Sequence, residues 1–229
     1  MLRLTPILLA LIYGFVAWRF SAWRTRAELD ARSAELADPA LAPVFARLAQ
    51  ALDLPRLRVH LYDVEPVNGL AAPDGRIFIT RGLHERFRTG AISAEEIASV
   101  IAHELGHVAL GHTRRRAIDF SGQNAARVAL AAVLGRFLPG IGPALATFAA
   151  NLLAKRMSRK DEHEADAYAT ALLIKAGIGA APQMSLLQKL DGMAGRGSTP
   201  PAWISTHPPA RERIARIEAN HRRWSVPAR

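Results

Sequence analysis

Apolar residues recur at helical spacing along residues 93–111, which makes this the most clearly marked element of the chain. The apolar positions share one helical face, and they are Ile97, Val100, Ile101, Leu105 and Val108. Ser93 can cap the first turn while Glu96 reaches back to it, which is the reciprocal pattern of a capping box. Gly111 supplies a stop. The pattern therefore predicts a capped amphipathic helix with one buried face.

Shorter patterns predict a small sheet and several further helices. Residues 57–62 alternate apolar and polar side chains as a half-buried strand does, and residues 77–79 form a second strand. Residues 66–72 are predicted as a loop, and Pro73-Asp74-Gly75 as a turn. Further helices are expected over 28–54, 83–87, 158–175, 181–193 and 211–223. We therefore expect a mainly helical α+β fold.

An apolar segment opens the chain and predicts a membrane anchor. Residues 4–20 approach the length that spans the hydrocarbon core. The carboxyl end of this segment is aromatic and basic, with Trp18, Arg19, Phe20, Trp23, Arg24 and Arg26. A secretory signal and a buried core helix are the alternatives, but Ala17 and Ala22 each lie two residues after a phenylalanine, where a cleavage site needs a small residue. We predict an uncleaved transmembrane helix within 1–26 and a single domain over 27–229.

A second apolar stretch, residues 125–154, is interrupted by residues that break helices or carry charge. The interrupting residues are Arg127, Arg136, Pro139, Gly140, Gly142 and Pro143. They predict a helical hairpin that packs on the domain or lies at a membrane surface. Residues 137–154 approach spanning length, so a second membrane span is the alternative.

Composition limits the chemistry that the chain can support. It has no cysteine, so disulfides and thiolate metal sites are excluded, and any metal must be held by histidine and carboxylate side chains. The formal net charge is +10. The basic residues lack the interleaved aromatics or the binding motif of a nucleic-acid surface, so we expect no nucleic-acid partner. An arginine-rich surface facing anionic lipid headgroups and an ordinary solvated surface both remain open.

The predicted helix over 93–111 contains the run His103-Glu104-Leu105-Gly106-His107. Residues four apart share a helical face, so both imidazoles can reach one metal ion. Glu104 can reach a metal-bound water without ligating the metal, which is the geometry that a general base needs. Chance occurrence and hydrogen-bonded core histidines are the alternatives, and the position on a capped amphipathic helix disfavours both.

A catalytic zinc site needs three protein ligands and one open position for water. The run Asp161-Glu162-His163-Glu164-Ala165-Asp166 offers the third ligand. Glu162 and Asp166 share a helical face, so one can bind the metal while the other accepts the N–H of a ligating histidine. On geometry alone Asp161 or Glu164 could replace Glu162. For this acidic cluster taken alone, a solvated helical face is the alternative.

Three segments together resemble the HtpX-like and CAAX-prenyl-protease-like family of gluzincin metallopeptidases. They are His103-Glu104-Leu105-Gly106-His107, Ser158-Arg159-Lys160-Asp161-Glu162-His163-Glu164-Ala165-Asp166 and Thr206-His207-Pro208-Pro209. The resemblance implies a zincin-like metallopeptidase domain with one Zn²⁺ per chain. The implied zinc ligands are His103, His107 and Glu162, and Asp166 is implied to hold a ligand histidine.

The resemblance has two further implications. Residues 68–83 resemble the family's edge-strand segment, so we expect an extended peptide to pair along 77–80. Gly69-Leu70 departs from the commoner pair of a small and an aromatic residue. His207 is implied either to approach the zinc as a reversible fourth ligand or to stabilise the oxyanion, and the alternative is a loop histidine that caps the last helix. The other histidines are expected to be ordinary surface or helix-end residues, namely His60, His84, His112, His163 and His221.

The sequence therefore predicts a zinc metalloendopeptidase that hydrolyses membrane or misfolded proteins, with Glu104 and His207 in catalytic roles. The alternative is a zinc-binding chaperone-like or interaction protein whose metal site is closed. Glu104 favours the enzyme, because a closed site has no use for a general base. The expected partners are a polypeptide substrate and membrane lipid, which the anchor over 1–26 contacts. The expected location is the bacterial inner membrane, and the arginines after the apolar segment favour a cytoplasmic catalytic domain.

Overall fold

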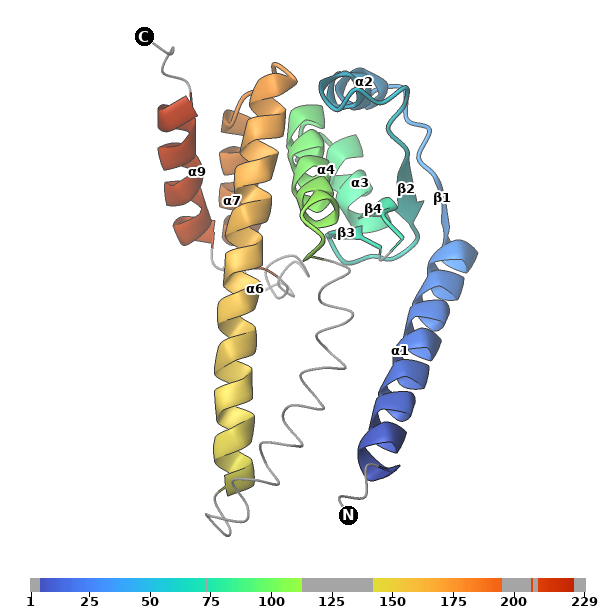
Figure 1. Ribbon diagram of the computed structural model, residues 1–229. Helices are drawn as coiled ribbons and strands as arrows, with labels where there is room; N and C mark the ends of the chain where they lie inside the picture. The colour runs from blue at the N-terminus through green and yellow to red at the C-terminus, as the bar shows by residue number, and fades with distance from the viewer. Residues whose placement is uncertain (1–4, 73, 113–141, 195–206, 208–209, 225–229) are drawn as a thin grey trace.

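The computed structural model describes the chain outside residues 1–4, 73, 113–141, 195–206, 208–209 and 225–229 (Figure 1). The helices are α1 (Thr5–Arg32), α2 (Ala42–Ala51), α3 (Arg81–Arg88), α4 (Ala94–Ala109), α6 (Gly142–Lys175), α7 (Ala181–Ala194) and α9 (Ala210–Trp224). The strands are β1 (Ser33–Glu35), β2 (Val59–Tyr62), β3 (Gly69–Ala71) and β4 (Ile77–Thr80). The mainly helical α+β architecture is confirmed.

The described strands form one mixed sheet in the order β1-β2-β4-β3. Strands β2 and β4 run parallel with Val59 opposite Ile77, whereas β1 pairs antiparallel with β2 and β3 antiparallel with β4. All four residues of β4 are buried. The expectation that a peptide pairs along 77–80 was therefore wrong, because β4 already has a neighbour on each side. Strand β3 lies at the edge instead, within the stretch that was predicted as a loop.

The predicted helix over 28–54 is divided in the structure. Helix α1 ends at Arg32, β1 follows, and α2 begins only at Ala42. Ser33 pairs with Tyr62 of β2, so a partner distant in sequence determines the conformation of this segment. A strand of three residues has no periodicity of its own, which is why the pattern of residues 28–54 did not reveal it.

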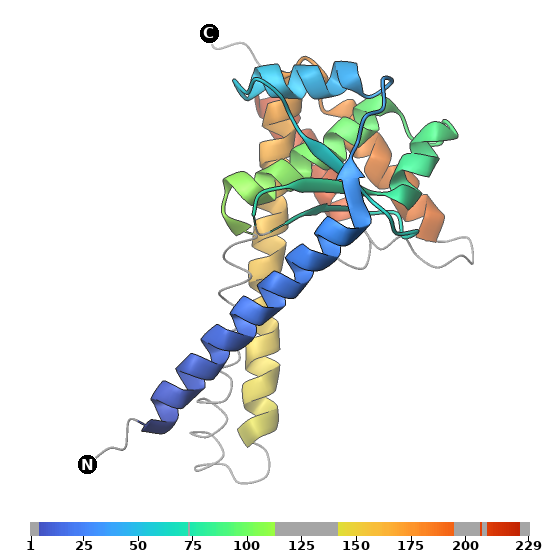
Figure 2. The same cartoon turned by 90° about the vertical axis from the view of Figure 1, so that its right-hand side faces the viewer.

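Helix α4 lies between the sheet and the helices α6 and α7, and it contributes more buried residues to the main core cluster than any other described element (Figures 1 and 2). The predicted capping box is confirmed: the Ser93 N–H donates to Glu96 Oε2 at 2.8 Å, and the Glu96 N–H donates to Ser93 Oγ at 3.2 Å. Ile97 and Ile101 are completely buried. Because α4 is fixed on several sides, the polar residues that it carries into the interior are held in defined positions.

Helix α6 is a single helix of 34 residues that includes the end of the predicted hairpin. The expected separation between 125–154 and 158–175 was wrong, because residues 144–175 contain no proline or glycine to break the helix. Residues 125–141 lie outside the described part of the chain. Figures 1 and 2 show that α1 and the first half of α6 both project from the body of the protein on the same side.

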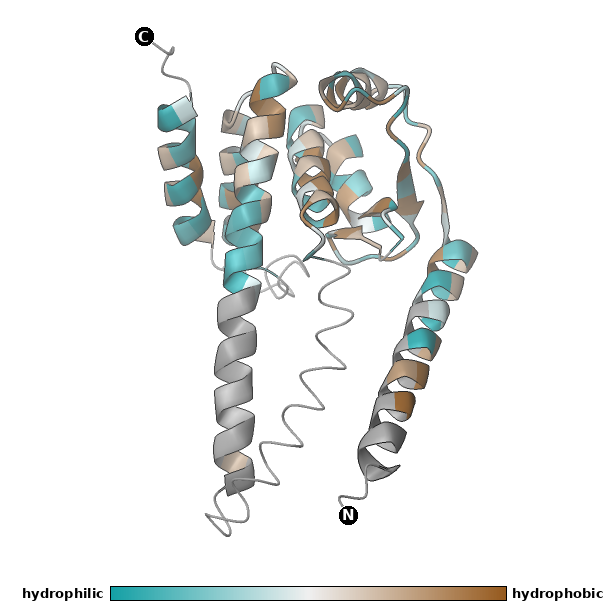
Figure 3. Cartoon of the chain, in the orientation of Figure 1, coloured by the Kyte–Doolittle hydropathy of each residue, from teal (hydrophilic) through white to brown (hydrophobic). Residues whose placement is uncertain are grey.

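The transmembrane helix predicted within 1–26 is not supported. Among the helices whose residues the structure describes, none is both long and apolar enough to cross a membrane. The hydrophobic middle of α1 gives way to hydrophilic residues towards Arg32 (Figure 3). Arg19, Arg24 and Arg26 lie within α1, and the helix continues past the predicted boundary at residue 26.

Helix α9 closes the described fold against α6 and α7. Its hydrophobic side faces these helices and its outer side is hydrophilic (Figure 3). Ile217 is completely buried and packs with Ala180 and Leu187 in a small separate cluster. Arg213, one turn before Ile217, is also buried, with 1% of its surface exposed. A charged residue on the apolar side of a helix requires a specific partner.

Candidate metal centre

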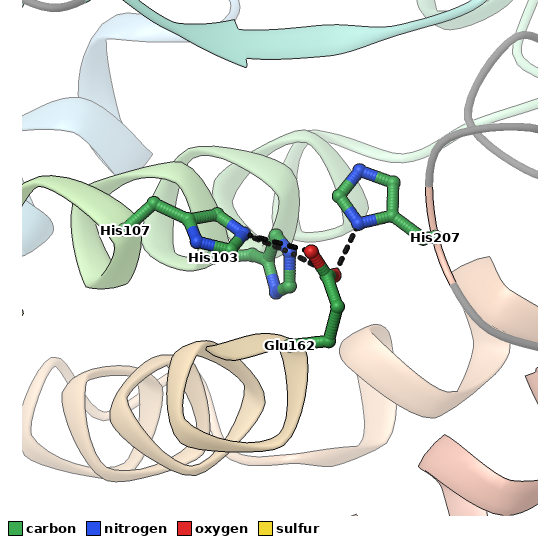
Figure 4. Close-up of side chains that lie close together, drawn as sticks. All are labelled: His103, His107, Glu162 and His207. Carbon is green, nitrogen blue, oxygen red and sulfur yellow. Dashed lines mark hydrogen bonds and ion pairs between the residues drawn. The ribbon is translucent and has the colours of Figure 1, made fainter. Parts of the chain in front are cut away.

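Two neighbouring helices bring three of the predicted ligands together (Figure 4). His103 and His107 project from α4, and their Nε2 atoms lie 3.1 Å apart. Glu162 projects from α6, with Oε2 3.3 Å from His103 Nε2 and Oε1 3.4 Å from His107 Nε2. All three side chains are buried. A spacing of four residues on α4 and the tight packing of α4 against α6 are sufficient to produce this convergence.

The donor atoms fit a metal ion in both chemistry and spacing. Two imidazole nitrogens and a carboxylate are a common donor set for a divalent cation. Donors about 2.0–2.2 Å from one tetrahedral ion are about 3.4 Å from each other, and the three measured separations are 3.1, 3.3 and 3.4 Å. With His207, these side chains form a group whose ligand atoms all lie within 4.8 Å of one another. The cluster could therefore hold one metal ion.

Burial and the neighbouring histidines have opposite effects on the pKa of Glu162. Burial raises the pKa of this carboxyl, but hydrogen bonds with His103, His107 and His207 outweigh burial and hold the pKa far below its usual range. For His103, burial lowers the pKa, while Asp166 and Glu162 together raise it to about 9. The site is therefore built to keep an ionised carboxylate among imidazoles.

His207 lies at the same cluster, on the side of Glu162 (Figure 4). Its Nδ1 contacts Glu162 Oε2, and its ring centroid is 5.0 Å from that of His103. Burial lowers the pKa of His207 to about 4, against the opposing effect of Glu162. A neutral imidazole at this position has a lone pair that can bind a metal.

Glu104 follows His103 on α4 and is 4% exposed. Burial lowers the pKa of Arg213, but the net pKa is raised. Asp166 raises it most, and the negative charge of Glu104 adds a smaller increase. The structure thus places Glu104 in the buried interior beside the cluster and close enough to Arg213 for an electrostatic interaction.

Asp166 lies one turn after Glu162 on α6 and contacts the Nδ1 side of the His103 ring. Its Oδ1 lies 3.0 Å from His103 Nδ1. Arg213 donates to both oxygens of Asp166, from Nε at 2.8 Å and from Nη2 at 2.7 Å. Burial raises the pKa of Asp166, but Arg213 and His103 hold it well below its usual range. This two-bond ion pair links α9 to α6 directly behind the metal cluster.

Sequence reasoning missed two residues at this centre. Arg213 had one available signal, since it precedes the apolar Ile217 by four residues and therefore falls on the buried side of α9. His112 was expected to be an ordinary surface or helix-end residue. It does lie at the end of α4, but it is completely buried beside His107 rather than on the surface. Asp161 and Glu164, which were alternatives to Glu162, lie at His112 rather than in the cluster of His103, His107, Glu162 and His207.

The histidine pair on α4 and the glutamate on α6 form a cluster that could hold a metal ion, and this arrangement is typical of the metallopeptidase class. The comparisons agree: the model of peptidase family M48 matches residues 35–221. Metalloprotease LoiP of Escherichia coli K12 is 32% identical over 158 residues, which are 69% of this chain and 60% of the relative. A protease HtpX homolog of Acidiphilium cryptum JF-5 is 30% identical over 248 residues, covering 89% of this chain and 82% of the relative. The chain belongs to peptidase family M48, and the resemblance to HtpX-like proteins is confirmed.

Other members of the same family also match. The mitochondrial metalloendopeptidase OMA1 of Arabidopsis thaliana is 31% identical over 148 residues, 64% of this chain and 28% of the relative. The chain spans 60% of the length of LoiP and 59% of the length of Metalloprotease YcaL of Escherichia coli K12.

Proposed function

We propose that this protein is a zinc metalloendopeptidase whose ligands are His103, His107 and Glu162. The observation that carries the proposal is the convergence of two Nε2 atoms and a carboxylate at separations of 3.1, 3.3 and 3.4 Å. Glu104 on the same helix supports an enzyme, since a purely structural ion needs no carboxylate beside the ligands. Membership of a peptidase family favours the same chemistry.

The proposed roles of the side chains follow from their positions. Zinc held by this donor set would polarise the scissile carbonyl and lower the pKa of a bound water. Glu104 takes a proton from the attacking water and delivers it to the leaving amine. Asp166 keeps His103 in the orientation that leaves its Nε2 directed at the cluster. His207 contacts Glu162 and completes the cluster, so it would either occupy the fourth position of the metal or, once moved away from Glu162, donate to the oxyanion.

We propose that the substrate is a polypeptide bound along β3. This strand pairs on one side with β4, lies at the edge of the described sheet and contacts α4, the helix of the metal centre. An edge strand offers backbone N–H and C=O groups to an extended peptide, and this mode of binding depends little on side-chain identity. Misfolded proteins, which expose extended segments, suit this mode, and unfolded segments of membrane proteins would bind in the same way.

The test of the catalytic proposal is Glu104→Gln, measured for zinc content and for cleavage of casein. We expect equal zinc in both proteins, and a loss of cleavage of about 10²–10⁴-fold in the variant, the usual effect of removing a general acid or base. Glu95→Gln removes the same charge from the first turn of α4 and serves as the control. Zinc absent from the wild type, or cleavage retained by Glu104→Gln, would reject the proposal.

We also propose that α1 attaches the protein to a membrane. Large hydrophobic side chains on this helix are exposed, namely Ile12, Phe15, Val16, Phe20 and Trp23, and such surfaces bind other apolar surfaces. Flotation with vesicles of anionic lipid should decrease when Phe20 and Trp23 are both changed to Ser. Leu54→Ser, an exposed leucine outside α1, should leave flotation unchanged. Equal flotation of all three proteins would argue against the attachment.

A further inference from the structure

His112 lies just beyond the end of α4, in contact with a predicted ligand. Its Nδ1 is 3.1 Å from Nδ1 of His107. If the helix continued, a residue five positions after His107 would point about 140° away from it. Leu110 ends α4, and Gly111 adopts a left-handed conformation with φ 69°. This turn breaks the helix and returns the His112 ring to His107, where it is completely buried.

The other nitrogen of His112 faces two carboxylates of α6. Its Nε2 is 3.1 Å from Glu164 Oε2 and 3.7 Å from Asp161 Oδ1. Ionised carboxylates accept hydrogen bonds and cannot donate them. The Nε2 atom of His112 is therefore the donor in this contact and carries a proton.

For a neutral His112, these contacts determine the direction of the hydrogen bond between the two rings. A neutral imidazole has one N–H and one acceptor nitrogen. Because His112 donates from Nε2, its Nδ1 is the acceptor, and the proton between the rings lies on Nδ1 of His107. The Nε2 atom of His107 then keeps its lone pair, and this atom lies 3.1 Å from His103 Nε2 and 3.4 Å from Glu162 Oε1.

We propose that His112 is a positioning residue of the metal centre, which fixes the ring orientation and the tautomer of His107 and links that ring to the carboxylates of α6. The inference rests on the proposed metal site. The two ligand histidines are thus supported in different ways. His103 contacts a carboxylate directly, at 3.0 Å from Asp166, whereas His107 reaches Glu164 and Asp161 through a second imidazole.

The side chains of His112, Asp161 and Glu164 could themselves hold a cation, but the tautomers disfavour this. A metal on Nε2 of His112 would move the ring proton to Nδ1 and make Nδ1 of His107 the acceptor. The proton of His107 would then lie on Nε2, where the ion bound by His103 and Glu162 needs a lone pair. Two ions would therefore compete, and the cluster with His103 has the larger number of buried donors.

The test is the zinc affinity of the full chain, measured by competition with a chelator. We expect His112→Ala to bind zinc about 10–100-fold more weakly, the usual effect of losing a hydrogen-bond partner of a metal ligand. His112→Asn should retain more affinity, because its Oδ1 can still accept from His107. The matched control is His84→Ala, which removes another histidine bonded to a carboxylate, at 2.8 Å from Asp38, and should leave the affinity unchanged.

The outcomes separate this inference from the proposed function. A wild type that binds no zinc rejects the metal centre itself, whereas wild-type affinity in folded His112→Ala rejects only the role of His112. Two zinc ions per wild-type chain would assign His112 to a second site and reject the inference. If neither His112 variant folds, ¹⁵N NMR of the zinc-loaded wild type decides. His112 protonated on Nε2 alone supports the proposal, and a proton on its Nδ1 overturns it.

Discussion

At the scale of single residues, the centre contains one more donor than a hydrolytic metal site uses. His103, His107 and Glu162 each offer one ligand atom, and the ligand atom of His207 lies within 4.8 Å of all three. Four protein ligands leave no position for a reacting water, which is the arrangement of structural rather than catalytic sites. We therefore predict that an ion bound by all four side chains would be in a closed form, and that activity requires His207 to move.

We predict that His207→Ala cleaves casein faster than the wild type while binding a similar amount of zinc. The reason is that the three remaining ligands leave the fourth position open to water. Zinc content and initial cleavage rates measure the effect, and His84→Ala, on the remote helix α3, is the control. Slower cleavage with unchanged zinc would assign His207 to the oxyanion instead, and the loss of zinc would make it an essential ligand.

The loss of Arg213 should strongly lower the stability of the fold. It is 1% exposed and donates two hydrogen bonds to Asp166, so Arg213→Ala leaves a buried carboxylate without its cation. We expect a decrease of about 3–5 kcal/mol in the free energy of unfolding. Arg216→Ala removes an exposed arginine from the same helix and should change it by less than about 0.5 kcal/mol. Denaturant titration of the metal-free proteins makes the comparison, and equal losses would contradict it.

At the scale of elements, α4 is anchored at its first turn by a buried carboxylate. Glu96 accepts hydrogen bonds from the Ser93 N–H at 2.8 Å, from Ser185 Oγ at 2.7 Å and from Lys189 Nζ at 2.8 Å. One side chain thereby caps α4 and attaches it to α7. Burial raises the pKa of Glu96, but these donors outweigh burial and leave the pKa below the ordinary value of 4.5.

The lowered pKa of Glu96 gives a pH-dependent prediction. A carboxyl whose pKa is lower in the folded state contributes stability that is complete above its unfolded pKa and is lost as the pH falls through the folded pKa. Glu96→Gln should therefore lower the free energy of unfolding by about 1–2 kcal/mol at pH 7, with a smaller difference below about pH 4.5. Urea titrations at both pH values test this, with Glu95→Gln as the control. A difference that grows on acidification would disprove the role.

Helices and strands were predicted correctly where several local sequence signals indicated the same element. They were missed where pairing with a segment distant in sequence determines the conformation. The capping box and the periodicity of α4 specified its start and its buried face without help from the rest of the chain. Strands β1 and β3 have three residues each, so only pairing with β2 and β4 defines them. The prediction divided helix α6 because the sequence changes from mainly apolar to mainly charged near residue 158. The backbone nevertheless stays helical across this position.

The predicted site illustrates the same distinction. His103 and His107 could be paired from their spacing, and Glu162 and Asp166 from theirs, because each pair lies on one helix. His112 and Arg213 could not, because their contacts depend on the turn at Gly111 and on how α9 docks against α6. The predicted membrane span is not supported among the described helices, and the division into an anchor over 1–26 and a domain over 27–229 stays a prediction.

At the scale of the whole molecule, the metal centre joins segments that are far apart in the chain. The candidate donors come from α4, from α6 and from the segment at His207, so the unfolded chain has no preformed site and an ion would bind the folded state selectively. Such binding stabilises by RT ln(1 + [L]/Kd), about 4 kcal/mol when free zinc exceeds Kd a thousandfold. A bound ion would therefore link the helices to one another, in addition to its role in the proposed hydrolysis.

We predict that removing the metal lowers the melting temperature, and that adding zinc restores it. The wild type should melt several degrees lower after dialysis against a chelator, because a domain of this size shifts by about 2–4 °C for each kcal/mol. Glu162→Gln, which weakens one ligand without changing its size, should melt at nearly the same temperature with and without zinc, so it controls for non-specific effects of the chelator. An equal response of both proteins would place the stabilising ion elsewhere. No response in either would mean that the convergence of α4, α6 and His207 is held by the protein alone.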